Sequence, residues 1–328
     1  MLNLPTWQTD WNRTRSMKRR GLIAGVAAAA FIAAQLGAQE PQPPAATFRS
    51  SIDLVRVTAV VRDHKGRFVQ ELTVHDFQVF DNGLTRPITE FQRDIAGVSV
   101  ALLFDVSGSM EGHLEYAREA ATHVLSWLNP VKDEAAIYTF DTRLEEVMPF
   151  TAGLKALPQA MKSVVPFGAT SLHDAIADTA KRVGSREGRR RAVVVLTDGN
   201  DNASRLTPPQ VSAIASEIDV PVYLFGIVPS IDNPTSEMAT NSVAQSALGG
   251  PLADLAAWTG GHAFVASTPA QRSAAARQII DELRHQYLIA FESSGSPGWH
   301  PLVVRARQKD LIVRARSGYF AGQSRPSF

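Results

Sequence analysis

The chain has 328 residues, of which 45% are hydrophobic and 20% are charged, and its formal net charge is +1. This composition is typical of a globular protein with a sizeable core, and the length favours about two domains. The small net charge gives no support to a protein that binds nucleic acid or an anionic membrane surface. Because the chain contains no cysteine, disulfides, zinc-thiolate sites and thiol nucleophiles are excluded.

The N-terminal stretch predicts export. Residues 17–20 (MKRR) are basic, residues 21–34 are apolar, and residues 36–38 offer small side chains for cleavage. The apolar run is shorter than the ~20 residues that a membrane-spanning helix needs. We therefore interpret residues 1–38 as a cleaved signal peptide and expect a periplasmic, cell-surface or secreted protein. A proline-rich, extended linker follows over residues 39–47.

A small β module is predicted over residues 48–95. Residues 51–62 are rich in β-branched side chains, residues 77–80 form a second strand, and Asn82-Gly83 gives a hairpin signal before the return strand at 87–91. A module of this size is too small for a strong core of its own. We expect it to pack with C-terminal strands into one accessory unit. These strands are predicted at 286–291, 301–307 and 311–316, and the C-terminal extension covers residues 291–322.

From residue 96 to residue 290, predicted strands alternate with predicted helices. This order is typical of an α/β fold with a doubly wound, mostly parallel sheet. Buried strands are expected at 98–104, 135–140, 192–196 and 220–228, and helices at 114–128, 154–165, 172–183, 252–258 and 269–284.

Polar residues follow two of these buried strands. Asp105 ends the first apolar run and is followed by Ser107 and Ser109, and Asp198 follows the run at 192–196. In an open α/β sheet, ligands bind at the carboxyl edge of the strands. If the two strands are neighbours, Thr170 in the loop between them joins this group. The resulting set of hard oxygens suits a small hard cation such as Mg²⁺.

The pattern Asp-x-Ser-x-Ser at 105–109, together with Thr170 and Thr197-Asp198-Gly199, resembles the metal-ion-dependent adhesion site of von Willebrand factor type A domains. The flanking segments also resemble a group of exported von Willebrand A-related proteins found mainly in Acidobacteria. The resemblance implies a Rossmann-like fold with an antiparallel edge strand, for which residues 144–148 are the candidate.

The resemblance also implies a metal site for Mg²⁺ or Mn²⁺. Ser107 and Ser109 would coordinate the ion directly, Thr170 directly or through water, and Asp105 and Asp198 mostly through water. A carboxylate from a protein partner would complete the coordination. The implied function is cation-dependent protein binding or adhesion, and not catalysis.

Several alternatives remain open at this point. Asp and Ser after a strand are commonly turn and capping residues. Ser171 with Asp174 resembles a capping box, Asp201 and Asn202 are interpreted as loop residues, and His173 as a surface histidine.

Two other functions also remain open. Asp105 could be the nucleophile of a Mg²⁺-dependent phosphohydrolase of the haloacid-dehalogenase type, although Ser107 stands where those enzymes carry a second Asp. The third possibility is a structural envelope protein whose metal site is vestigial.

Overall fold

A computed structural model describes residues 54–93, 97–186, 189–217, 219–227 and 250–321. The proposed signal peptide and linker lie outside these residues. No helix in the described ranges is long and apolar enough to cross a membrane.

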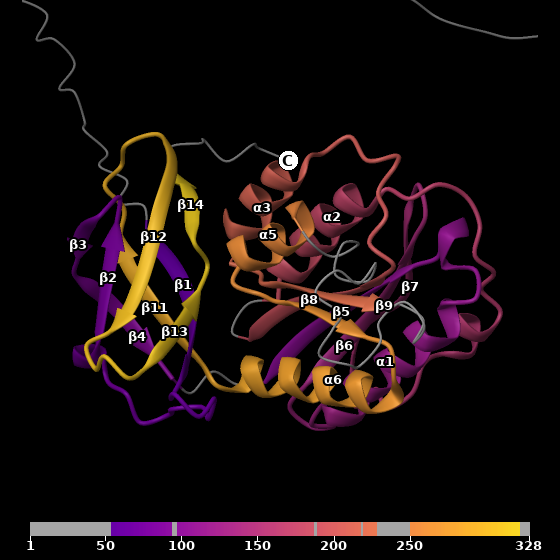
Figure 1. Cartoon of the computed structure of the whole chain (residues 1–328), viewed down its shortest axis with the longest axis horizontal. Coiled ribbons are helices and arrows are strands. Elements are labelled where there is room, and N and C mark those ends of the chain that lie inside the picture. Colours follow the sequence, from indigo (N-terminus) through magenta and orange to yellow (C-terminus); the bar gives the residue numbers. More distant parts are fainter. Residues whose placement is uncertain (1–53, 94–96, 187–188, 218, 228–249, 322–328) are drawn as a thin grey trace, which may run out of the picture. The chain divides into compact units, whose positions relative to one another are not determined.

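The central feature is a six-stranded mixed sheet with the order β10-β9-β8-β5-β6-β7. Figure 1 shows this sheet between two layers of helices. Five of its strands are parallel, and only the edge strand β7 runs antiparallel, against β6. This confirms the expected mostly parallel α/β fold and its antiparallel edge. The strands are β5 (Val98–Asp105), β6 (Glu134–Phe140), β7 (Leu144–Ala152), β8 (Arg190–Thr197), β9 (Val222–Ile227) and β10 (Ala263–Ala266).

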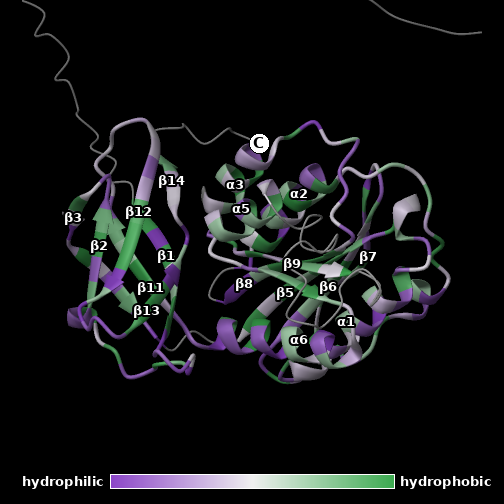
Figure 2. Cartoon of the chain, viewed as in Figure 1, coloured by the Kyte–Doolittle hydropathy of each residue, from purple (hydrophilic) through white to green (hydrophobic). Residues whose placement is uncertain are grey.

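Helices cover both faces of this sheet, which explains why its inner strands are continuous apolar runs. Every residue of β5, β6 and β9 is buried, and Figure 2 draws these strands largely in hydrophobic green. One core contains the apolar faces of α1 (Leu114–Trp127) and α6 (Pro269–Arg284). The opposite core contains those of α2 (Leu172–Gly184), α3 (Pro208–Glu217) and α5 (Pro251–Trp258).

The expected helix at residues 154–165 is wrong. This segment contains only a short 3₁₀ turn, η3 (Gln159–Lys162), which begins directly after Pro158. Proline lacks the amide hydrogen that a helix interior requires, so Pro158 divides the segment, and Pro166 follows it. The chain therefore crosses to the next helix as a loop.

The flanking strands form two four-stranded sheets, with the orders β13-β1-β11-β4 and β14-β12-β2-β3. Both sheets contribute side chains to one apolar core, in which Phe77, Tyr287 and Tyr319 are buried. This confirms the expected β accessory unit. Its elements are β1 (Leu54–Arg62), η1 (Val74–Asp76), β2 (Phe77–Asp81), β3 (Leu84–Arg86), β4 (Ile88–Gln92), β11 (Gln286–Glu292), β12 (Gly298–Ala306), β13 (Ile312–Ala315) and β14 (Gly318–Ala321).

The strand β11 crosses the position at which the central domain was expected to end. All of β11 from residue 286 to residue 292 pairs with β1. An end of the central domain at residue 290 would divide this strand, so we propose instead that the domain ends at α6, near residue 285.

Candidate metal centre

The site lies where the sheet reverses its strand order. The chain passes from β5 to β6 on one side and later returns to place β8 on the other side of β5. The parallel pairing of β5 and β8 ends with Phe104 opposite Leu196. Asp105 and Thr197, the last residues of β5 and β8, therefore lie side by side at the carboxyl edge of the sheet, where open α/β sheets bind ligands.

Asp105 is fully buried and anchors the loop that follows β5. Its Oδ1 accepts hydrogen bonds from the Ser107 amide at 3.0 Å and from the Ser107 hydroxyl at 2.6 Å. Its Oδ2 accepts a hydrogen bond from the Thr197 hydroxyl at 2.7 Å. One carboxylate thus joins the ends of β5 and β8.

Burial raises the pKa of the Asp105 carboxyl to about 6, from an ordinary value of 3.8. The hydrogen bonds from Ser107 and Thr197 act in the opposite direction, because they favour the charged form. The negative charge of Asp198 raises the pKa of Asp105 further. Two carboxylates thus repel each other at this edge, and a cation between them would relieve that repulsion.

The two serines lie on a tight turn directly above this carboxylate. The chain forms the short 3₁₀ helix η2 (Gly108–Met110) immediately after Ser107. The Ser107 and Ser109 hydroxyl oxygens lie 3.1 Å apart. Ser107 is buried, whereas Ser109 is exposed to solvent.

Backbone hydrogen bonds bring the loop of Thr170 to this turn. The Phe167 amide donates to the Val106 carbonyl at 2.9 Å, and the Gly108 amide donates to the Gly168 carbonyl at 3.0 Å. Gly168 has a φ of +87°, a conformation that favours glycine. A Cβ on Gly108 would lie 3.3 Å from the Gly168 carbonyl oxygen, so two glycines allow the two loops to approach closely.

The segment after Asp198 holds Thr170 in place. The Asn202 Oδ1 atom accepts a hydrogen bond from the Thr170 amide at 2.8 Å. In return, the Thr170 carbonyl accepts hydrogen bonds from the amides of Asn202, at 3.0 Å, and Ala203, at 2.9 Å. Thr170 is itself buried. Asn202 is therefore a positioning residue for Thr170, which its interpretation as a loop residue missed.

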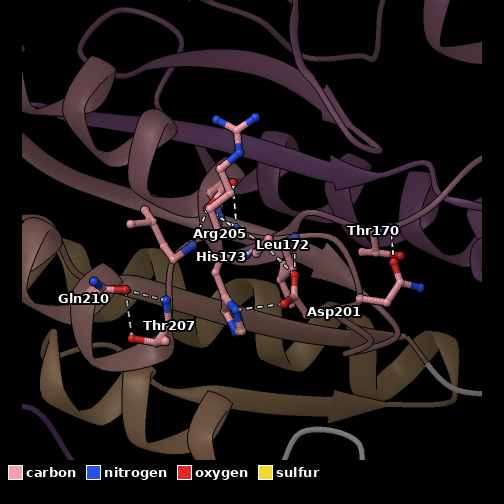
Figure 3. A network of polar contacts seen from close by, with 11 residues as sticks. Thr170, Leu172, His173, Asp201, Arg205, Thr207 and Gln210 are labelled. Atoms are coloured by element: carbon pink, nitrogen blue, oxygen red, sulfur yellow. Dashed lines mark hydrogen bonds and ion pairs between the residues drawn. The ribbon is translucent and has the colours of Figure 1, made fainter.

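Asp201 fixes the start of α2 next to Thr170 (Figure 3), and the Ser204 hydroxyl accepts from the His173 amide of the same turn. Asp201 Oδ1 accepts from the Leu172 amide at 2.9 Å and from the Ser204 hydroxyl at 2.6 Å. The His173 Nδ1 atom lies 3.0 Å from Asp201 Oδ2. His173 thus belongs to a polar network beside the site and is not an unattached surface histidine.

The expected capping box of Ser171 and Asp174 is wrong. The Ser171 side chain makes no capping hydrogen bond to α2. Asp174 accepts instead from the backbone amides of Arg205 and Leu206, at 3.1 and 2.9 Å. The residues that cap α2 come from the 201–204 segment, so a local three-residue pattern could not identify them. A run of Asp, Asn and Ser after the strand that ends at Thr197 was the only signal in the sequence, and it is also typical of an ordinary turn.

The arrangement suits a hard divalent cation. Mg²⁺ holds oxygen ligands at about 2.1 Å in an octahedron, so neighbouring ligands lie about 3 Å apart. The separation of the two serine hydroxyl oxygens matches this edge length. Because the Ser107 hydroxyl donates its hydrogen to Asp105, its lone pairs remain available to a cation. Within the described ranges, no cluster of three or more His, Asp or Glu side chains is placed to hold a metal ion.

Comparison with known proteins identifies the central region. Residues 100–200 match the family model of the von Willebrand factor type A domain. A search of the curated proteins returned no significant match.

Among solved structures, the chain is similar to an aerotolerance-related membrane protein from Bacteroides fragilis, with 19% identity and a TM-score of 0.45 over 57% of this chain and 98% of that one. It is also similar to a von Willebrand factor type A protein from Catenulispora acidiphila, with 12% identity and a TM-score of 0.44 over 83% and 76% of the two chains. A third similar structure is proximal thread matrix protein 1 from the mussel byssus, with a zinc-occupied MIDAS motif, at 19% identity and a TM-score of 0.45 over 62% and 49%. The sequence match over residues 100–200 contains the loops of Asp105 and Thr170 together with Asp198, so the candidate site lies within the part of the chain that matches the von Willebrand factor type A domain.

Proposed function

We propose that this protein is an exported module that binds another protein through a divalent cation. Ser107, Ser109 and Thr170 would supply hydroxyl oxygens to Mg²⁺ or Mn²⁺, and Asp105 and Asp198 would act mostly through water and hydrogen bonds. When bound, the ion supplies a positive charge that a partner's Asp or Glu carboxylate can complete. The observation that carries this proposal is the pair of serine hydroxyls, 3.1 Å apart, above a buried carboxylate.

The phosphohydrolase alternative has less support. A nucleophilic carboxylate must reach the substrate, but Asp105 is fully buried and both of its oxygens accept hydrogen bonds. Nucleophilic catalysis also requires an activated and accessible group. We therefore propose a role for Asp105 in organising the site, and not in attacking a phosphate.

The proposed export depends on the sequence of residues 1–38, in which a basic segment precedes a short apolar run and small residues. The linker over residues 39–47 would then separate the cleavage site from the first described strand, which begins at Leu54.

Isothermal titration with Mg²⁺ and with Mn²⁺ tests the metal site, using the chain from residue 39. Ser109→Ala is the informative variant, because Ser109 is exposed and its loss leaves the buried bonds of Asp105 intact. Ser126→Ala is the matched control, since Ser126 is an exposed serine near the end of α1. We expect Ser109→Ala to weaken binding at least about tenfold, the loss of one good ligand contact, and Ser126→Ala to bind as the parent does.

Equal affinities in the parent and Ser109→Ala, or no binding in either, would overturn the proposed site. In that case a melting temperature that does not change with Mg²⁺ would favour the structural alternative. Metal-dependent hydrolysis of p-nitrophenyl phosphate that disappears in Asp105→Asn would favour the phosphohydrolase.

A further inference from the structure

The loop that carries Thr170 also carries two prominent apolar side chains. Phe167 is 80% exposed and Val165 is 78% exposed. Among the described residues, Val131 is the only other large apolar residue with an exposed fraction above three-quarters. Single exposed apolar residues are common on protein surfaces, but these two are separated only by Pro166 and lie beside the candidate metal centre.

The backbone fixes the position of this pair against the serine turn. The Phe167 amide donates to Val106, directly after Asp105, and the next residue, Gly168, accepts from Gly108 between the two serines. Phe167 and Thr170 therefore lie on either side of the glycine that contacts the turn. Main-chain hydrogen bonds therefore hold the backbone of Phe167 at the rim of the site, while its ring stays in solvent.

Within the described part of the chain, neither of these side chains belongs to an apolar core. Val164 and Leu154 pack against the core of α1 and α6, and Met161 is fully buried in it, so the same loop does bury other apolar residues. Arg118 also ties this part of the loop down, by donating to the carbonyls of Met161 and Val164. Exposure of Phe167 and Val165 is thus not a result of a detached loop.

We propose that Phe167 and Val165 form an apolar rim that contacts the partner next to its metal-bound carboxylate. The proposal deepens the proposed function and depends on it. Together, the cation and the apolar rim fit one kind of partner. This partner is a protein segment in which an Asp or Glu residue is next to a large apolar residue. The charge of the carboxylate complements the cation, and the apolar neighbour covers the rim.

A peptide library displayed on phage provides the test. The library is captured on the immobilised chain in millimolar Mg²⁺ and released with chelator, so that only metal-dependent binders are recovered. We expect these peptides to carry an acidic residue beside a large apolar one. In Phe167→Ser, their affinity should fall by about ten- to a hundredfold, as expected when most of an aromatic contact is lost.

Matched variants separate the rim from the metal. Val131→Ser removes an equally exposed apolar side chain that lies just before β6, at the amino end of its strand and thus at the other edge of the sheet. It should bind the peptides as the parent does. Phe167→Ser should keep the Mg²⁺ affinity and melting temperature of the parent, because the residue is mostly exposed, whereas Phe167→Leu should retain much of the peptide binding.

The outcomes distinguish the two proposals. Recovered peptides that are acidic but show no apolar preference, or that bind Phe167→Ser as they bind the parent, would overturn the rim and leave the metal-dependent function standing. Failure to recover any chelator-released peptide from the parent would overturn the proposed function, and the rim with it.

Discussion

Asp105 is the residue whose environment most strongly determines how the site behaves. Its carboxylate is fully buried, and burial together with the charge of Asp198 raises its pKa to about 6. In the unfolded chain the same group ionises near 3.8. The folded state therefore holds the proton more tightly, and ionisation at neutral pH costs the metal-free fold roughly 3 kcal/mol.

We predict that Asp105→Asn stabilises the metal-free protein at pH 7.5. The amide oxygen can still accept from Ser107 or Thr197, and the buried charge is removed. The stability that the protonated Asp105 contributes is fully present below about pH 4 and is lost as the pH rises through about 6. At pH 7.5 the variant should therefore have a higher Tm than the parent, by about 2–4 °C for each kcal/mol gained in the free energy of unfolding.

At pH 4 the difference in Tm should be close to zero. Thermal unfolding in chelator across this pH range provides the measurement. A variant that is less stable than the parent at pH 7.5 would show that the carboxylate's hydrogen bonds outweigh its desolvation.

This case also shows what the sequence could predict at the scale of single residues. An apolar run that ends in Asp-x-Ser-x-Ser identified Asp105, Ser107 and Ser109 as one group, because strand ends and loop spacing can be read from the chain. The burial of Asp105 could not be predicted, since it depends on Thr197, 92 residues away. Asp105→Ala, which would be harmless at an exposed loop edge, would here leave buried donors unpaired.

At the scale of elements, the site depends on a segment that has no regular secondary structure. The alternation of strands and most of the helices were predictable from apolar periodicity, whereas the strand order and the contacts of residues 201–204 with the start of α2 were not. Their bonds run from side chains to backbone groups about 30 residues away, and no local pattern encodes such partners. The expected helix at 154–165 is a second error at this scale. The apolar spacing of the segment favoured a helix in the sequence analysis, but Pro158 prevents one in the structure.

We predict that Asn202→Ala weakens Mg²⁺ binding without unfolding the domain. It removes the acceptor of the Thr170 amide, and an unpaired amide costs about 1–3 kcal/mol when it is buried. The backbone amides of residues 202 and 203 still reach the Thr170 carbonyl. Mg²⁺ affinity should therefore fall by several-fold, and amide exchange at residues 170–172 should become faster.

Two variants serve as controls for this prediction. Asn202→Asp keeps an oxygen acceptor and should retain most of the affinity, whereas Asn200→Ala changes an exposed neighbour and should have little effect. Unchanged Mg²⁺ affinity in Asn202→Ala would show that Thr170 does not depend on this bond for its position, or does not contact the ion.

At the scale of the molecule, the accessory unit is assembled from both ends of the chain. The strand β1 pairs with β11 and β13, and β2 pairs with β12, so segments more than 200 residues apart are neighbours in both sheets. The sequence indicated such an assembly only through the argument that each flank alone is too small to form a core. It could not indicate the register, because many pairings of alternating strands satisfy the same pattern.

We predict that removal of residues 294–328 destroys the accessory unit. The deletion takes away β12, β13 and β14, so β2 loses its main partner and the core loses Leu302, Val304 and Tyr319. The side chains of Phe77 and Val79, buried in the full chain, would then face water, and the flank should become sensitive to protease and prone to aggregation. Limited proteolysis of the full chain should release no stable fragment covering residues 48–95. A soluble truncated chain with the protease resistance of the parent would mean that the N-terminal strands fold without their C-terminal partners, which the shared core argues against.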